Sequence, residues 1–211
     1  MTRRDTAQRI LEASLELFNR HGEANVTTNQ IADELDISPG NLHYHFKRKR
    51  QIVSRLFDSF SSEMDSVLLD AGDRSLELED LWLYLHLVFE TIGRYRFIYK
   101  DVNDLLERYD ELHQPFTRIL ARQRLSADSF CNALSASGVL EIDEPDQQTL
   151  VDHIVMTITF WIPFSEIYPA LSRGNGDILA RAIYQVISLA IPYLREPERS
   201  LARSLALSYR E

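Results

Sequence analysis

VTTNQIADELDISPGNLHYHFKRK, residues 26–49, is the stretch of sequence that decides the fold. Thr27 or Thr28 can cap a short helix, because a hydroxyl beside the first turn accepts a hydrogen bond from a free backbone N–H. Ser38-Pro39 marks the start of a second helix, Gly40–Lys47, as a capping residue followed by a proline whose fixed φ suits the first turn. The stretch therefore predicts two short helices joined by a tight turn.

An earlier helix completes the core of this pair. Apolar and small side chains recur at three- and four-residue spacing and stop at His21-Gly22, a glycine of the kind that ends helices. Three helices in this order predict a helix-turn-helix domain over residues 1–49. The buried stripe of the first helix consists of Ile10, Ala13, Ser14, Leu17 and Phe18.

The last of these three helices has the two faces that a DNA-reading helix needs. Such a helix presents small polar residues to the major groove while apolar residues anchor its other side. Leu42 and Phe46, four residues apart, are the predicted anchors. Hydroxyls and N–H groups at helix starts suit phosphate oxygens, and Thr27, Thr28 and Ser38 supply them. The residues that point away from the anchors are Gly40, Asn41, His43 and Tyr44.

Charge is distributed unevenly along the chain. The net charge is −9, which by itself argues against a nucleic-acid partner, because phosphate binding needs positive potential. Residues 1–50, however, hold eight basic and seven acidic groups, so the acidity belongs to the remainder. Half of those basic groups form the run Lys47-Arg48-Lys49-Arg50. This run can meet a phosphate backbone, or it is an ordinary solvated helix start.

These residues resemble a known family. Val26-Thr27-Thr28-x-x-Ile31-Ala32 and Ile37-Ser38-Pro39-Gly40-Asn41-Leu42-His43-Tyr44-His45-Phe46-Lys47-x-Lys49 are similar to the TetR regulators. Those regulators are homodimers in which small molecules bound by the C-terminal helices alter DNA affinity. The resemblance implies base and phosphate contacts from Thr28 and from residues 40–45, and a backbone clamp at Lys49. The candidate DNA-binding residues are Thr27, Thr28, Ser38, Pro39, Gly40, Asn41, His43, Tyr44, His45, Lys47 and Lys49.

The chain departs from the family pattern at two places. It has Asn41-Leu42-His43 where Thr-Leu-Tyr is commonest, so the base preference is expected to differ. It has Arg50 where an acid is common, which adds an expected phosphate contact. His43 and His45 lie two apart on a helix, which splays them, and no Cys or carboxylate joins them at ligand spacing. No metal site is therefore predicted.

The remainder, residues 50–211, shows helical period almost throughout and no alternating strand pattern. We therefore predict an all-α protein, in which the helix-turn-helix domain is followed by a larger helical effector-binding and dimerisation bundle. Asp70-Ala71-Gly72-Asp73 and Arg173-Gly174-Asn175-Gly176 are the predicted breaks. Helices are expected at about Arg50–Leu69, Leu78–Tyr95, Ile98–Tyr109, Pro115–Gly138, Asp146–Ser172 and Asp177–Leu194.

The helix around Leu81–Tyr95 is apolar nearly all round, so it should lie in the middle of the second domain. An aromatic pocket with a few polar handles suits a small, largely apolar effector, although the same residues also make an ordinary core. Residues 82–101 and Tyr184-Gln185-Val186 are loosely similar to regulators of polyhydroxyalkanoate operons, which implies an acyl-CoA-like effector. The candidate effector-binding residues are Trp82, His86, Phe89, Arg96, Phe116, Phe130 and Trp161.

The last two long helices carry more apolar surface than one core requires. The first has two faces, which consist of Leu150, Ile154, Thr157, Ile158 and Trp161 on one side and Val151, Val155, Thr159 and Ile162 on the other. Helices that are apolar on two sides imply a partner, so we predict a homodimer through these helices. A two-fold dimer would bind a pseudo-palindromic double-stranded DNA operator. Pro163 and Pro169 are expected to kink the first helix, and Pro192 the end of the second.

Several classes of protein are disfavoured. No catalytic motif is present, and Cys131 lies among apolar residues as a small buried hydrophobe would, so neither an enzyme nor a cofactor is predicted. No segment resembles a signal peptide, and apolar runs such as Ile154–Ile162 are too short to span a membrane, so a cytoplasmic protein is expected. The alternative is a helical metabolite-binding or interaction module that does not read DNA.

Overall fold

The computed structural model describes residues 3–68, 78–168 and 178–208. Every regular element in these ranges is a helix, and one isolated antiparallel bridge pairs Leu140 with Leu194, which confirms the all-α prediction. The chain forms two compact units. The first unit comprises residues up to 63 together with 95–116, and the second comprises 64–94 together with residues from 117 onward.

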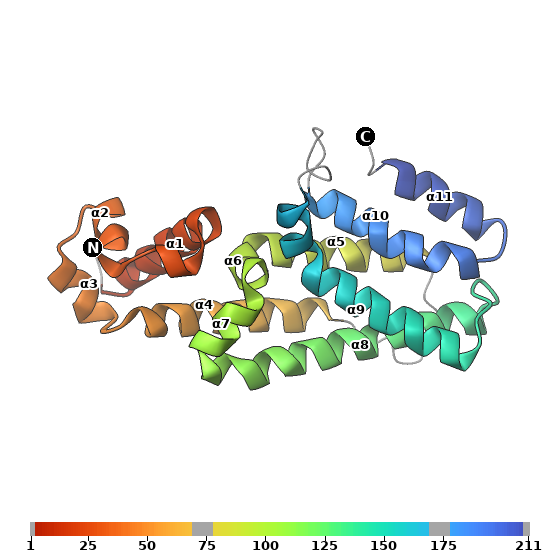
Figure 1. Ribbon diagram of the computed structural model, residues 1–211, viewed down its shortest axis with the longest axis horizontal. Helices are drawn as coiled ribbons and strands as arrows, with labels where there is room; N and C mark the ends of the chain where they lie inside the picture. Colours follow the sequence, from red (N-terminus) through yellow and green to blue (C-terminus); the bar gives the residue numbers. More distant parts are fainter. Residues whose placement is uncertain (1–2, 69–77, 169–177, 209–211) are drawn as a thin grey trace. The chain divides into compact units, whose positions relative to one another are not determined.

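The first unit contains the helix-turn-helix (Figure 1). The domain boundary between residues 49 and 50 stays a prediction: a long helix begins at Lys49, and the compact unit also takes in residues 95–116. The elements of the first unit are α1 (Arg3–His21), η1 (Glu23–Asn25), α2 (Thr28–Glu34), α3 (Pro39–His45), most of α4 (Lys49–Val67), α6 (Arg96–Lys100), α7 (Val102–Arg108) and η2 (Asp110–Leu112).

The residues predicted to end α1 and to start α2 and α3 do so in the structure. Gly22 follows α1 with φ +81°, a left-handed conformation that glycine adopts without strain. Thr27 caps α2 in a capping box: its Oγ1 accepts from the Gln30 N–H at 3.3 Å, and Gln30 Oε1 accepts from the Thr27 N–H at 2.8 Å. Ser38 Oγ caps α3 by accepting from the Asn41 N–H at 3.2 Å.

One helix was expected over Ile98–Tyr109, and this expectation is wrong. Asp101 has a non-helical backbone (φ −129°, ψ 47°) and separates α6 from α7, with neither glycine nor proline to announce the break. The short helix α6 packs into the core of the first unit. The Phe97 ring lies 5.4 Å from that of Phe18 on α1, and the Tyr99 ring lies 5.8 Å from that of Phe60 on α4.

A buried carboxylate joins distant parts of the first unit. The Glu23 side chain is only 4% exposed and accepts from the Lys49 ammonium at 2.6 Å, the Arg108 guanidinium at 2.6 Å and the Tyr109 hydroxyl at 2.5 Å. Lys49 Nζ also donates to the carbonyl oxygens of Glu23 at 2.8 Å and Val26 at 2.9 Å. Burial and the neighbouring carboxylate raise the pKa of Tyr109. We call the side chains of Glu23, Lys49, Arg108 and Tyr109 the Glu23 network.

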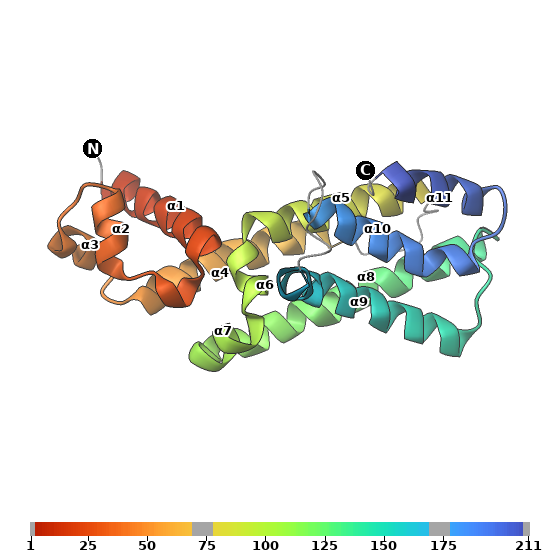
Figure 2. The ribbon, with the colours of Figure 1, turned by 45° about the horizontal axis from the view of Figure 1, so that its top comes forward.

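The second unit is a helical bundle around α10, which packs against α9, α5 and α11 (Figure 2). Gly93 on α5 allows a close approach, because a Cβ at this position would lie 2.5 Å from Leu179 Cδ1 on α10. The Trp161 indole N–H on α9 donates to the Ile178 carbonyl at 2.9 Å. The elements are α5 (Leu78–Arg94), most of α8 (His113–Ala136), α9 (Glu144–Ile167), α10 (Ile178–Ala190), η4 (Ile191–Tyr193) and α11 (Glu198–Ser208).

Most predicted helices of the C-terminal part are present, with shifted ends. Helix α9 continues through Pro163, while α10 gives way to the 3-10 turn η4 around Pro192. Helix α11 was not predicted. The expected breaks at 70–73 and 173–176 and the expected kink at Pro169 lie outside the described residues.

Helix α9 has an exposed apolar face that differs from the predicted one. Both faces identified in the sequence are largely buried within the chain: Leu150, Val151, Ile158, Thr159, Trp161 and Ile162 are each at most 7% exposed. The outward face instead carries Met156, Phe160, Phe164 and Ile167, which are 44–82% exposed. The prediction that one of these two faces is left over for a partner is therefore wrong, because the core of the chain covers a wider arc of α9 than the pattern suggested.

Among the described residues, α9 is the one helix whose length and composition would allow it to cross a membrane. Its most apolar window has a mean hydropathy of 1.3 and is 39% buried within the protein. Core helices of globular proteins meet the same criterion.

Replacing Lys49 by Met should lower the free energy of unfolding by about 2–4 kcal/mol, because it removes one cation from a buried carboxylate that keeps two other partners. Urea unfolding measures this change. Lys47→Met, two residues away and exposed, should change the stability by less than about 0.5 kcal/mol. Equal stabilities of the two variants would show that the Glu23 network does not stabilise the unit.

Candidate nucleic-acid interface

Helix α3 has one buried face and one exposed face. Leu42 is fully buried and Phe46 is 7% exposed, which confirms both as anchors. Asn41, His43 and Tyr44 are exposed, and Tyr44 reaches 63% exposure. The Tyr44 and His45 rings meet edge to face at 5.3 Å, with His45 half-buried. The helix therefore offers an amide, an imidazole and a phenol on a face held in place from behind.

The turn before α3 fixes its orientation against α2. Four residues, Leu35 to Ser38, join the two helices, and Asp36 adopts a left-handed conformation with φ +51°. The N–H groups of Leu35 and Ile37 both donate to the Ala32 carbonyl, at 3.2 and 3.0 Å. Aspartate is among the few residues that tolerate this conformation, so the tight turn needs no glycine.

The candidate phosphate contacts lie at the helix starts. Thr27, Ser38, Pro39 and Gly40 are exposed and Thr28 is half-buried. The hydroxyls of Thr27 and Ser38 already cap α2 and α3. Both hydroxyls therefore start helices, and their contacts with DNA stay a prediction.

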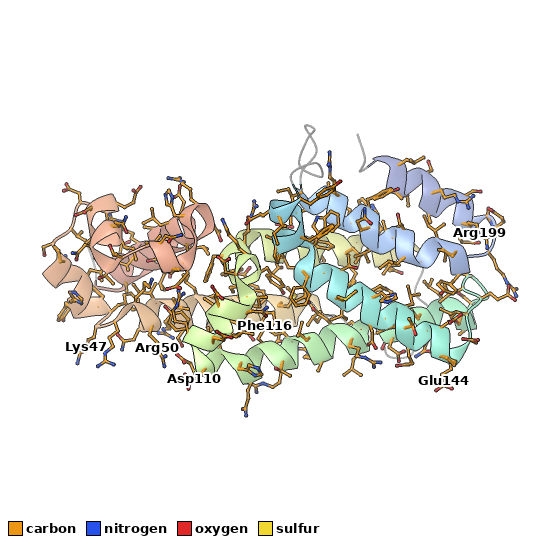
Figure 3. All side chains as sticks on the ribbon, in the orientation of Figure 1. Lys47, Arg50, Asp110, Phe116, Glu144 and Arg199 are labelled. Atoms are coloured by element: carbon orange, nitrogen blue, oxygen red, sulfur yellow. The ribbon has the colours of Figure 1, made fainter. Side chains whose placement is uncertain are left out.

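The basic run divides into two pairs. Lys47 and Arg48 are exposed, and neither side chain forms an ion pair within the described part of the chain. Lys49 belongs to the Glu23 network, whereas Arg50 is paired with Asp110 and Glu111. Figure 3 labels Lys47, Arg50 and Asp110 among the side chains of the first unit. The geometry thus favours an internal role for Lys49 over the phosphate clamp that the resemblance implies. The convergence of three donors on one buried carboxylate was not foreseeable from spacing.

The seven candidate effector residues do not form one cluster within either unit. Arg96 and Phe116 belong to the first unit, where the Phe116 ring lies 5.8 Å from that of Tyr99. The other five belong to the second unit. There the Trp82 and His86 rings are 4.0 Å apart, and Phe130 lies 5.0 Å from Tyr84. Phe89 and Trp161 are buried, at 1% and 7% exposure.

A cavity of about 10 Å³ adjoins Trp82, between α5, α10 and α11. This volume holds roughly one water molecule, and the lining is apolar. The Trp82 indole N–H is buried without a hydrogen-bond partner. It is therefore a donor that an acceptor on a small molecule could satisfy after local rearrangement.

The interior of the second unit also contains polar residues that the sequence pattern did not reveal. The Tyr84 hydroxyl hydrogen-bonds to Ser126, and burial raises the pKa of Tyr84 to about 12. Burial and the nearby Asp128 carboxylate raise the pKa of Cys131 to about 12, so this thiol stays protonated at neutral pH. Neutral tyrosine and thiol groups are compatible with an apolar ligand.

The sequence did not predict the Glu23 network. Glu23, Arg108 and Tyr109 come together from segments about eighty residues apart, and no local pattern marks them. In the described ranges, no group of three or more His, Cys, Asp or Glu side chains could hold a metal ion.

Two family models match the chain. The model described as "Bacterial regulatory proteins, tetR family" matches residues 10–56, which include the whole helix-turn-helix. The model described as "Bacterial transcriptional repressor" matches residues 59–201, which is more than half of the chain. The two matches together extend from α1 to α11.

Known proteins agree with these matches. The transcriptional regulator AcrR of Shigella flexneri is 22% identical over 147 residues, covering 59% of this chain and 68% of AcrR. The crystal structure of a TetR-family transcriptional regulator from Marinobacter aquaeolei VT8 is 34% identical, covers 100% of both chains and superposes with a TM-score of 0.86. A SmeT–triclosan complex shares the fold at 18% identity, with a TM-score of 0.58 over 92% of this chain and 93% of SmeT.

The chain thus has a capped α2, an anchored α3 with an exposed polar face, and a helical bundle later in the sequence. It also matches one family along most of its length. The protein belongs to the TetR family of DNA-binding transcriptional regulators, which are not enzymes.

Proposed function

We propose that this regulator is a repressor that binds a pseudo-palindromic operator as a homodimer and releases it when a small, largely apolar effector binds. The observation that carries the proposal is α3, whose buried Leu42 and Phe46 hold Asn41, His43 and Tyr44 outward. Side chains on such a face reach base edges in the major groove. Lys47 and Arg48, exposed next to α3, supply the phosphate contacts.

The exposed face of α9 supports a second copy of the chain as partner. Met156, Phe160, Phe164 and Ile167 form an apolar strip at helical spacing, and Tyr168 extends it by stacking on Phe164 at 6.3 Å. Monomers rarely expose large contiguous apolar patches. A second copy would cover the same strip with its own, as in an isologous two-fold interface. Such a dimer presents two copies of α3 to the two half-sites of an operator.

The interior of the second unit supports an apolar effector. Its described buried polar residues are uncharged, whereas the buried carboxylate of Glu23 lies in the first unit. The likeness to regulators of polyhydroxyalkanoate operons favours an acyl-CoA-like molecule, and SmeT, a fold neighbour, forms a complex with triclosan. The acyl chain would lie among residues such as Phe89 on α5 and Phe130 on α8. The proposal also includes that the protein represses transcription and works in the cytoplasm.

DNA reading predicts different effects for two kinds of variant. Against a duplex selected from a randomised pool, Tyr44→Ala and Asn41→Ala should each weaken binding by about 1–3 kcal/mol and relax the sequence preference, because each removes a base contact. Lys47→Ala should weaken all sequences alike and lower the salt slope by about 0.9 for each phosphate that is no longer neutralised, so about twice that in a dimer. If folded Tyr44 and Asn41 variants bind every duplex as the wild type does, α3 is not the reader, and another part of the chain must contact the bases.

Dimerisation predicts that Phe164→Glu yields a folded monomer at micromolar concentration by light scattering, because a carboxylate on the strip would be buried unpaired in the interface. Leu125→Glu is the matched control. Leu125 lies on α8, is 65% exposed and is not part of the strip, so this variant should remain a dimer. A monomeric wild type, or a dimeric Phe164→Glu, contradicts this interface.

An acyl-CoA effector, present at a concentration of 100 times its dissociation constant, should stabilise the protein by about 2.7 kcal/mol, which corresponds to a rise in melting temperature of several degrees. The same acyl-CoA should weaken operator binding. Free coenzyme A, which lacks the acyl chain, serves as the control and should do neither. Acyl-CoAs of several chain lengths that change neither quantity would exclude this class of effector.

A further inference from the structure

Arg50 is bound by the segment 108–111 through exposed contacts. Its guanidinium donates to the Arg108 carbonyl at 2.9 Å and pairs with the carboxylates of Glu111 at 3.0 Å and Asp110 at 3.4 Å. The Tyr109 ring lies 5.6 Å from the guanidinium carbon. The side chains of Arg50, Asp110 and Glu111 are 50%, 86% and 37% exposed. Ion pairs this exposed add little to stability, so a stronger anion can displace them.

Lys49, the residue before, is in the opposite situation. Its side chain is 23% exposed, and its ammonium is bonded to the buried Glu23 carboxylate and two carbonyl oxygens. Removing it would leave a buried carboxylate short of a partner, which is costly. Of the two internally paired cations in the basic run, Arg50 is therefore the one that DNA could recruit.

The surroundings of Arg50 suit a phosphate strand. An open groove of about 930 Å³ lies beside it, bounded by α1, the end of α3, the start of α4 and η2. Its lining includes the donors Gln8, His45, Arg50 and Arg55, and Glu111 is the acid among the lining residues. His45 follows Tyr44 directly, so the groove borders the proposed base-reading helix. Glu111 stands where it would repel a phosphate.

We propose that Arg50 is a DNA-phosphate contact and that Asp110 and Glu111 compete with DNA for it as an internal counter-ion. This inference rests on the proposed DNA-binding function. A free arginine gains affinity from releasing mobile counter-ions, whereas Arg50 must first exchange one anion for another. The competition lowers affinity for all sequences and leaves discrimination to α3.

The test uses the full-length protein and a mixed-sequence duplex, with binding measured by fluorescence anisotropy as a function of salt. The variant Asp110→Asn/Glu111→Gln should bind more tightly than the wild type, by about eightfold at roughly 0.1 M salt for each arginine freed, with a salt slope steeper by about 0.9 per arginine. The control Asp104→Asn/Glu107→Gln makes the same change in net charge with exposed residues of α7. It should show only the small, general effect of added positive charge.

The Arg50→Gln background separates competition from general electrostatics. In that background, the Asp110→Asn/Glu111→Gln substitutions should give no gain beyond that of the control pair, because the residue they release is absent. Thermal unfolding confirms that each variant is folded. A gain equal to the control pair, or a gain that persists without Arg50, overturns the proposal. A wild-type protein that binds no duplex even at low salt would instead refute the proposed function itself.

Discussion

The first unit depends on one buried carboxylate. A charge that is withdrawn from water is stable in a protein only when donors surround it, and Glu23 draws its donors from Lys49, Arg108 and Tyr109. Lys49 begins α4, while Arg108 and Tyr109 lie at the end of α7, so the same carboxylate ties the turn after α1 to two other helices. This explains how a compact unit can consist of two separate stretches of chain. Lys49 also donates to the Val26 carbonyl, so the network reaches the residues just before α2.

The fold could be predicted wherever its cause is local. A glycine that ends α1, a hydroxyl that caps α2 and a Ser-Pro pair that opens α3 act within a few residues, and all three are present. The break at Asp101 and the helix α11 escaped prediction. The break has neither glycine nor proline, and α11 packs through Ala202 and Ala206, whose small side chains give a weak periodic signal. The outward face of α9 was misplaced because periodicity shows how wide an apolar arc is, not which neighbours cover it.

The candidate site follows the same division. Leu42, Phe46 and the residues facing away from them could be placed from a four-residue spacing. The fate of the four basic residues at 47–50 could not, because it depends on acids that lie far away in sequence. Positive charge in the sequence is thus an upper bound on the charge available to a ligand. Here two of the four basic residues are paired internally. Lys49 is held strongly by the buried Glu23, whereas Arg50 is held weakly by the exposed Asp110 and Glu111.

The positions of the two tryptophans have a spectroscopic consequence. The chain has two, Trp82 on α5 and Trp161 on α9, and both belong to the second unit. Trp161 is buried with its N–H bonded to the Ile178 carbonyl, and Trp82 lies against His86. Tryptophan emission is therefore a property of the bundle alone, and the helix-turn-helix is silent in it. A tryptophan introduced on α3 of a variant that lacks Trp82 and Trp161 would report on the first unit alone, so that comparison with the native chain would follow the melting of each unit.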